Sequence, residues 1–326
     1  MGVTRSCNQE VYGVKVFGPV PSRRLGRSMG INNIPPKLCT YSCVYCQLGR
    51  TRRMEVRRAP FYEPREILQE TEKKIAKTRK IGLSVDYLTF VADGEPTLDV
   101  NLGREIEMFQ PLGIKVAVIT NGSLISLEDV REDLAKADWV SLKVDCTQED
   151  LWRRINRPKQ TLQLQAILNG MLEFGRAFKG ELVTETMLVR GVNNNRDCLQ
   201  EVAEFLERLQ PAKAYVSIPT RPPAEKWVEP PDEEGVNEAY QIFTEHLDNV
   251  ECLTGYETTD FSPTGDPSED ILSITAVHPM LEEAVKAFLL QAKADWSMIE
   301  RLINQGQLIE LNYQGKRFYM RRLPTK

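Results

Sequence analysis

Segments with strand character alternate with segments of helical periodicity through most of the chain, and this alternation constrains the fold most strongly. Short runs of β-branched and aromatic residues are each followed by longer stretches with apolar residues at helical spacing. Such an alternation implies a parallel sheet wound in right-handed β-α units, with functional sites at the carboxyl ends of the strands. The expected strands are 28–32, 87–91, 115–120, 139–144, 182–189 and 214–218. The expected helices are 64–79, 102–109, 128–136, 161–178 and 198–209.

The chain changes character after a loop rich in Pro, Gly, Asp and Ser at residues 261–270. Two helices followed by a β-hairpin are typical of a winged helix. Residues 279–326 hold eight Lys/Arg against five Asp/Glu, a mild excess that favours docking over DNA reading. We therefore expect two domains, an α/β domain over 1–268 and a winged helix over 269–326. The expected elements of the second are a strand near 271–276, helices 279–291 and 298–304, and strands 308–313 and 317–320.

Three cysteines, Cys39, Cys43 and Cys46, lie within the stretch CTYSCVYC with the spacing C-x3-C-x2-C. Iron–sulfur clusters are held by cysteine thiolates, and three so close together can hold three corners of a [4Fe-4S] cluster. With no fourth ligand nearby, one iron is left open for a ligand that is not protein.

Two other uses of these cysteines fit less well. A structural zinc site takes four closed ligands, but the two histidines, His246 and His278, lie about 200 residues away in sequence. A disulfide framework is unexpected in a long chain with seven cysteines, an odd number.

Composition and charge place the chain among ordinary soluble proteins. No run of 18 apolar residues is present, and the N-terminus lacks the apolar core of a signal peptide, so we expect a cytoplasmic protein with no membrane association. The net charge is −4, yet residues 1–58 carry eleven Lys/Arg against two Asp/Glu. The basic stretches 21–27 and 50–58 flank the cysteines. They could form a rim for phosphate or nucleic acid, or pair with acidic residues of the same domain.

The cysteine spacing, with Tyr45 directly before the third cysteine, resembles the signature of the radical S-adenosylmethionine (SAM) superfamily. The resemblance implies a partial (β/α)6 barrel and a [4Fe-4S] cluster whose open iron binds the amino and carboxylate groups of SAM. It further implies reductive cleavage of SAM to a 5′-deoxyadenosyl radical, with an electron from a reductant such as flavodoxin or ferredoxin.

Asp93-Gly94-Glu95-Pro96-Thr97 follows the second expected strand and resembles the Gly-Gly-Glu-Pro segment of that family, with Asp93 in place of the first glycine. The resemblance implies that Gly94, Glu95 and Pro96 contact the SAM ammonium. An ammonium offers three donors, and glycine permits close backbone approach. The alternative is a plain β-turn.

Further candidates lie at later strand ends. Thr120-Asn121-Gly122 is a generic turn signal that resembles the family segment lining the SAM pocket, which implies a cofactor contact for Asn121. Ser141, Lys143 and Asp145 alternate along the next strand. The resemblance implies that Ser141 and Lys143 bind the carboxylate or ribose of SAM, and the alternative is a buried Lys–Asp pair. Glu185 and Arg157 are weaker candidates, and no catalytic residue is identified.

The stretch FGPVPSRRLGRSMGINN, taken with the segments above, resembles a subgroup classed with the wyosine-base tRNA synthases, over about residues 14–265. This chain lacks the cysteines of their second cluster, because only Cys7 precedes the loop, and its pI is near 5.6. We expect a radical SAM enzyme acting on RNA, a peptide or a protein. The contrasting hypothesis is a non-enzymatic, metal-binding winged-helix regulator.

Overall fold

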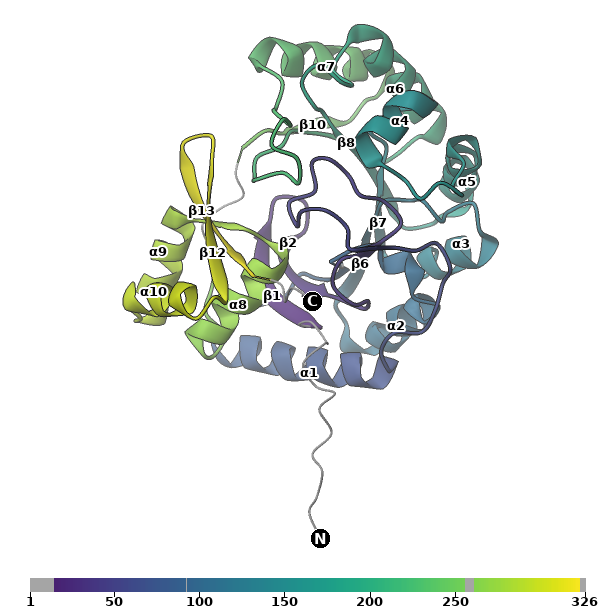
Figure 1. Ribbon diagram of the computed structural model, residues 1–326. Coiled ribbons are helices and arrows are strands. Elements are labelled where there is room, and N and C mark those ends of the chain that lie inside the picture. Colours follow the sequence, from purple (N-terminus) through teal and green to yellow (C-terminus); the bar gives the residue numbers. More distant parts are fainter. Residues whose placement is uncertain (1–14, 92, 256–260, 323–326) are drawn as a thin grey trace.

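The computed structural model describes residues 15–91, 93–255 and 261–322, so Cys7 lies outside the described residues. Six strands run parallel in one sheet, which confirms the predicted β-α alternation. Their carboxyl ends meet on one side, where the connecting loops gather (Figure 1). The strands are β2 (Gly26–Ile31), β5 (Tyr87–Phe90), β6 (Lys115–Thr120), β7 (Trp139–Lys143), β8 (Glu181–Met187) and β9 (Lys213–Ser217).

Two strands that the sequence analysis did not predict extend this sheet at its edges. β1 (Val16–Ser22) pairs antiparallel with β2, and β10 (Val250–Leu253) pairs parallel with β9. Within the described residues the order is β1-β2-β5-β6-β7-β8-β9-β10, so the first and last strands are free edges of an open barrel. The fold is thus α/β with a mixed, mostly parallel sheet, consistent with a radical SAM barrel. β1 was missed because prolines interrupt its pattern. β10 was missed because its four residues, VECL, include only one β-branched and no aromatic residue.

Helices follow the strands and cover the outer face of the sheet (Figure 1). The five predicted helices are present. The one predicted over 102–109 has those bounds, and the other four have a shifted end, for example α5, which begins at Leu164 rather than at 161. Two further helices, α4 and α7, were not predicted. The helices are α1 (Pro64–Lys80), α2 (Leu102–Phe109), α3 (Glu128–Leu134), α4 (Glu149–Asn156), α5 (Leu164–Ala177), α6 (Arg196–Leu209) and α7 (Glu233–His246), with 3-10 turns η1 (Pro96–Leu98) and η2 (Gln110–Leu112).

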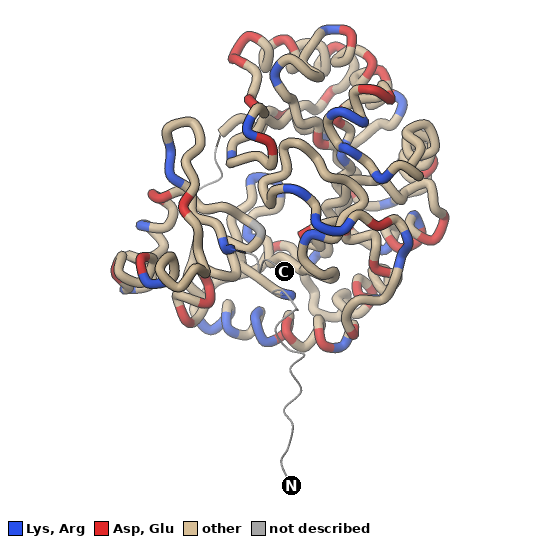
Figure 2. The backbone as a smooth tube through the Cα atoms, viewed as in Figure 1, with Lys and Arg blue, Asp and Glu red and all other residues tan. Residues whose placement is uncertain are grey.

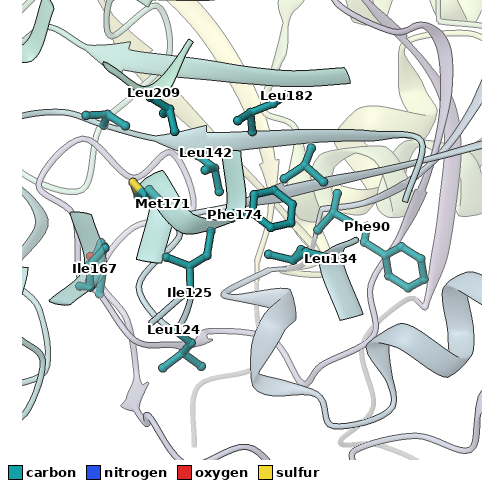
Figure 3. Close-up of a cluster of buried hydrophobic side chains, with 14 of the residues drawn as sticks. Phe90, Leu124, Ile125, Leu134, Leu142, Ile167, Met171, Phe174, Leu182 and Leu209 are labelled. Carbon is teal, nitrogen blue, oxygen red and sulfur yellow. The ribbon is translucent and has the colours of Figure 1, made fainter. Parts of the chain in front are cut away.

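Alternation along each strand divides the side chains between two buried clusters. Val140 and Leu142 of β7 pack toward the helices, and Figure 3 shows Leu142 close to Met171 and Phe174 of α5. Trp139 belongs instead to a cluster on the opposite, inner face of the sheet. The same alternation turns Lys143 inward and therefore toward the site.

The C-terminal part packs against β1 through α8 (Pro267–Val277). The predicted strand at 271–276 is wrong, because this segment lies within α8. Pro267 occupies the first turn of that helix, and the Asp266 side chain caps it by accepting from the backbone N–H groups of Ser268 and Glu269.

The two predicted helices and the hairpin are present, and among the described residues three strands form a sheet in the order β11-β13-β12. The elements are β11 (Met280–Leu281), α9 (Glu282–Ala292), α10 (Ser297–Asn304), β12 (Leu308–Tyr313) and β13 (Lys316–Arg321), with β3 (Leu38–Cys39) and β4 (Arg53–Met54) forming a separate pair near the N-terminus.

None of the helices in the described ranges is long and apolar enough to cross a membrane.

A buried carboxyl group lies in α2, the helix that follows β5 and the turn η1. Glu105 of α2 is fully buried, and within the described part of the chain neither of its carboxyl oxygens has a hydrogen-bond partner. Burial, with the nearby Asp99 and Asp133, raises the pKa of Glu105 to about 9. The neighbouring Asn33 Oδ1 also lacks a donor there, so a protonated Glu105 can satisfy it.

We predict that Glu105→Gln makes the folded chain more stable at pH 8 by more than about 1 kcal/mol. Between the ordinary pKa of 4.5 and about 9, the folded chain holds a proton that the unfolded chain releases, so stability falls as the pH rises. Glutamine is neutral throughout and removes that slope. Urea unfolding at pH 5 and pH 8 checks this, with the exposed Glu132→Gln as control. Equal slopes in the wild type and Glu105→Gln would contradict it.

Candidate active site

A cavity of about 320 Å³ opens at the carboxyl ends of the strands. This volume is in the range of small-molecule sites. Its wall brings together the loop that carries the three cysteines and the strand-end segments after β5, β6, β7, β8 and β9. Of the predicted site residues, the cavity is lined by Cys39, Cys43, Tyr45, Cys46, Gly94, Glu95, Asn121 and Lys143.

The cysteine loop folds back on itself beside this cavity. Cys39 ends β3, which pairs with β4, and the chain between them turns through the bonds from Cys46 N to the Cys43 carbonyl (3.1 Å) and from Gly49 N to the Cys46 carbonyl (2.9 Å). The three thiols are partly exposed toward the cavity. Burial of the surrounding loop raises the pKa of Cys43 to about 12 and that of Cys39 as well.

Two asparagines from outside the loop donate to the cysteine sulfurs. Asn121 Nδ2 lies 3.6 Å from Cys39 Sγ, and Asn156 Nδ2 lies 3.5 Å from Cys43 Sγ. Asn156 Nδ2 also lies 3.3 Å from the Tyr45 hydroxyl and 2.7 Å from Asp145 Oδ2. Asn156 and Asp145 were not predicted as site residues, because neither belongs to a recognisable motif.

The thiols fit a cluster better than a single ion. Among the described residues, no group of three or more His, Cys, Asp and Glu side chains is close enough to hold one metal ion. In a [4Fe-4S] cubane each thiolate binds a different iron, so three separated thiols around one cavity suit it. The described cavity wall contains no fourth cysteine, so a cluster held by these three would keep one iron without a cysteine ligand from this wall.

Gly94 lets the strand-end segment lie directly against the cysteine loop. The Asp93 carbonyl accepts from Lys37 N at 2.8 Å, and Glu95 N donates to the Leu38 carbonyl at 3.2 Å. A Cβ atom at residue 94 would stand 1.7 Å from that Leu38 carbonyl oxygen. Only glycine permits this approach, so the segment is more than a plain β-turn.

Glu95 is buried in the cavity wall and held by hydrogen bonds. Its Oε1 accepts from Thr97 N (3.0 Å) and from the hydroxyls of Thr97 (2.6 Å) and Thr120 (2.5 Å). Its Oε2 accepts from Asn121 N at 2.8 Å, and a carboxylate oxygen can accept a second bond. Burial raises the pKa of Glu95 despite these donors. A cation in the cavity would compensate the buried carboxylate.

Asp93, where the family pattern has glycine, adds a second buried carboxylate at this end. Burial raises the pKa of Asp93 to about 7. Its Oδ1 has no hydrogen-bond partner among the described residues. The cysteine end of the cavity therefore carries two buried carboxyl groups against one lysine, Lys37, a balance that suits a bound cation.

Lys143 does not pair with Asp145, so that alternative is corrected. Its Nζ lies 2.7 Å from Glu185 Oε1 and 5.3 Å from the centroid of the Tyr45 ring. Asp145 instead bonds the Tyr45 hydroxyl and accepts from Met187 N at 2.9 Å. In the register of β7 and β8, Lys143 lies directly opposite Glu185. Glu185 lines the cavity, whereas the sequence left open which face of its strand points inward.

Two predicted site residues are not among those that line the cavity. Ser141 is buried on β7 and is not among the residues that line the cavity. Pro96 begins the turn η1, and its carbonyl accepts from Asn33 Nδ2 at 3.2 Å. Contacts of either residue with SAM stay predictions.

Several arginines of the basic stretches beside the cysteine loop are paired with carboxylates. Arg50 and Arg157 both bind Glu225, and Arg58 is buried beside Asp129 and a second carboxylate of α3. Figure 2 shows basic residues along the central loops and a mixture of basic and acidic residues over the surrounding helices. Arg157 is thus tied to protein, and internal pairing accounts for part of the basic excess, while Arg23 and Arg24 of the first stretch lie in the cavity wall.

The chain belongs to the radical SAM superfamily, whose family model matches residues 33–206. It is 46% identical over 312 residues to the UPF0026 protein MJ1312 of Methanocaldococcus jannaschii, a match covering 95% of this chain and 97% of that one. Members of the superfamily are enzymes, and the comparisons give no support to the non-enzymatic regulator.

Two solved structures have a fold similar to that of this chain. A radical SAM methyltransferase from Sphaerobacter thermophilus superposes with a TM-score of 0.56 at 16% identity, covering 70% of this chain and 66% of that one. TYW1 with a lysine-pyruvate adduct bound superposes with a TM-score of 0.53 at 19% identity, covering 68% and 74%. At these identities the similarity concerns the fold alone.

We predict that Gly94→Ala destabilises the chain by roughly 1–3 kcal/mol, the usual cost of overpacking, and weakens SAM binding. The methyl group must push residues 93–95 away from the Leu38 carbonyl. Thermal unfolding and equilibrium dialysis with SAM measure the two effects. Gly265→Ala, where a Cβ meets no atom within 4 Å, is the matched control. Unchanged stability and SAM affinity in Gly94→Ala would contradict the prediction.

Proposed function

We propose that this chain is a radical SAM enzyme that holds a [4Fe-4S] cluster through Cys39, Cys43 and Cys46 and cleaves SAM reductively to modify a substrate. The observation that carries the proposal is that these three thiols share one cavity with Glu95, Asn121 and Lys143. A bound cluster of this type supplies an electron to SAM, which divides into methionine and a 5′-deoxyadenosyl radical.

The residues of this chain position the cofactor. Glu95 Oε2 and the backbone carbonyls around Gly94 accept from the SAM ammonium at the acidic end of the cavity. Lys143, held on β7 by Glu185, offers a positive charge to the SAM carboxylate. Tyr45 is fixed by Asp145 and closes the wall beside the cysteines.

The C-terminal elements fit a winged helix. Their order is helix, short strand, two helices and hairpin, and the hairpin strand β13 pairs with β11. We propose that this unit forms the second domain and presents a peptide or protein substrate, with RNA as the other candidate. The pairing of the arginines around the cysteine loop supports the former. A cytoplasmic location and a flavodoxin or ferredoxin as reductant complete the proposal.

The proposed activity predicts 5′-deoxyadenosine formation by the anaerobically reconstituted protein with dithionite and SAM. Cys43→Ala is expected to lose the iron and at least about 100-fold in product, because a thiolate that holds the cluster is removed. Cys252→Ala, which changes a half-buried cysteine of β10 outside the cavity, serves as control. Zinc without iron in metal analysis, and no product from the wild type, would contradict the proposal.

A second prediction concerns the bonds from asparagine to sulfur. Asn121→Ala is expected to lower the midpoint reduction potential of the reconstituted cluster, because hydrogen bonds to the sulfurs stabilise the more negative, reduced state. Spectroelectrochemical titration measures this, with the exposed Asn169→Ala as control. An unchanged or higher potential in Asn121→Ala would rule out this role.

A further inference from the structure

The turn between β1 and β2 reaches across the open side of the barrel. Arg23 Nη2 donates to the Gly255 carbonyl, just beyond β10, at 2.8 Å. Leu25 of the same turn is buried in the inner cluster with Tyr215 and Leu253. The turn therefore joins the two edges of the sheet and brings two adjacent arginines into the cavity wall.

Arg24 and Lys143 share one carboxylate in this wall. Both bind Glu185, Lys143 through Oε1 and Arg24 through Oε2, and Ser217 Oγ donates to Oε1 at 3.0 Å. The side chains of Arg24, Lys143 and Glu185 are only 15%, 18% and 10% exposed. Burial alone would raise the pKa of Glu185, but Lys143 and Arg24 outweigh it and hold that pKa well below its ordinary range.

Counting these groups leaves an excess of positive charge at this end. Two cations and one carboxylate give a net charge of +1, which matches the single carboxylate proposed for SAM at Lys143. Arg23 bonds a neutral carbonyl and adds a further positive charge to this wall, which leaves an excess for a second anion. Buried charge of one sign favours an ion of the opposite sign. The far end of the cavity, with Asp93, Glu95 and the cysteines, has the opposite character.

We propose that the substrate carries an anionic oxygen group, a carboxylate or a phosphate, that binds Arg23 and Arg24 at the β1–β2 turn. This rests on the proposed function, in which SAM occupies the acidic end and directs its carboxylate to Lys143. The planar guanidinium groups of two adjacent arginines match an oxyanion with paired N–H donors. The anionic group is thereby held at the turn, and the rest of the substrate lies between the turn and the cofactor.

Equilibrium dialysis of radiolabelled inorganic phosphate and acetate tests the proposal, using the reconstituted full chain with SAM and no reductant, at constant ionic strength. We expect saturable binding of at least one of these anions at one site per chain. Arg23→Gln and Arg24→Gln should each weaken it about tenfold or more. Arg57→Gln, an exposed arginine outside the cavity wall, is the control and should bind as the wild type does.

The relative affinities for phosphate and acetate identify the chemical class of the anionic group on the substrate. Stronger binding of phosphate points to a phosphorylated substrate or a nucleotide chain, and stronger binding of acetate to a carboxylic acid. Absence of saturable binding, or equal affinity in the wild type and both arginine variants, would overturn the proposal. The dialysis contains no reductant, so it measures anion binding separately from SAM cleavage. Anion binding that both variants weaken, with no 5′-deoxyadenosine formed in the separate assay, would refute the proposed function; the anion site would then remain, but not as the substrate site of that reaction.

Discussion

The backbone contact between the Leu38 carbonyl and the segment Asp93–Glu95 is the constraint on which the site depends. It brings the cysteine loop and the end of β5 to within the distance that only a residue without a side chain allows. From there Glu95 bonds Thr120 and Asn121 at the end of β6, and Asn121 reaches the Cys39 sulfur. One glycine thus links the cysteine loop to two parallel strands.

The rest of the barrel arranges charge around this contact. The inward residues Lys143, Glu185 and Ser217 form one hydrogen-bonded row. Lys143 lies directly opposite Glu185 in the β7–β8 register, and Ser217 of β9 reaches Glu185 diagonally. The β1–β2 turn closes the open side and contributes Arg24 to the same row. The cavity is consequently acidic at the cysteine end and basic at the turn. This polarity suits a zwitterionic cofactor beside an anionic substrate.

The sequence sufficed for the parallel strands, because each buried strand carries its own local pattern. It sufficed also for grouping the cysteines, Glu95 and Asn121, because strand ends of a parallel sheet meet at one edge. It did not suffice for Asp145, Asn156 or Arg24, whose roles arise from contacts between residues a hundred or more positions apart in sequence. The helix α8 was taken for a strand because its apolar residues alternate, whereas the cap at Asp266 and the proline after it decide the structure locally. Ser141 lies on the same face of β7 as Lys143, as the alternation predicts, yet it is not among the residues that line the cavity.

The central claim is that three thiolates hold a cluster whose remaining iron takes SAM. Electron paramagnetic resonance of the dithionite-reduced, reconstituted protein, recorded with and without SAM, tests it most directly. The account predicts a [4Fe-4S] signal whose g-values shift when SAM is added, because SAM becomes a ligand of the open iron. A [4Fe-4S] signal that SAM leaves unchanged, or the absence of any such signal from protein that contains zinc, would contradict it.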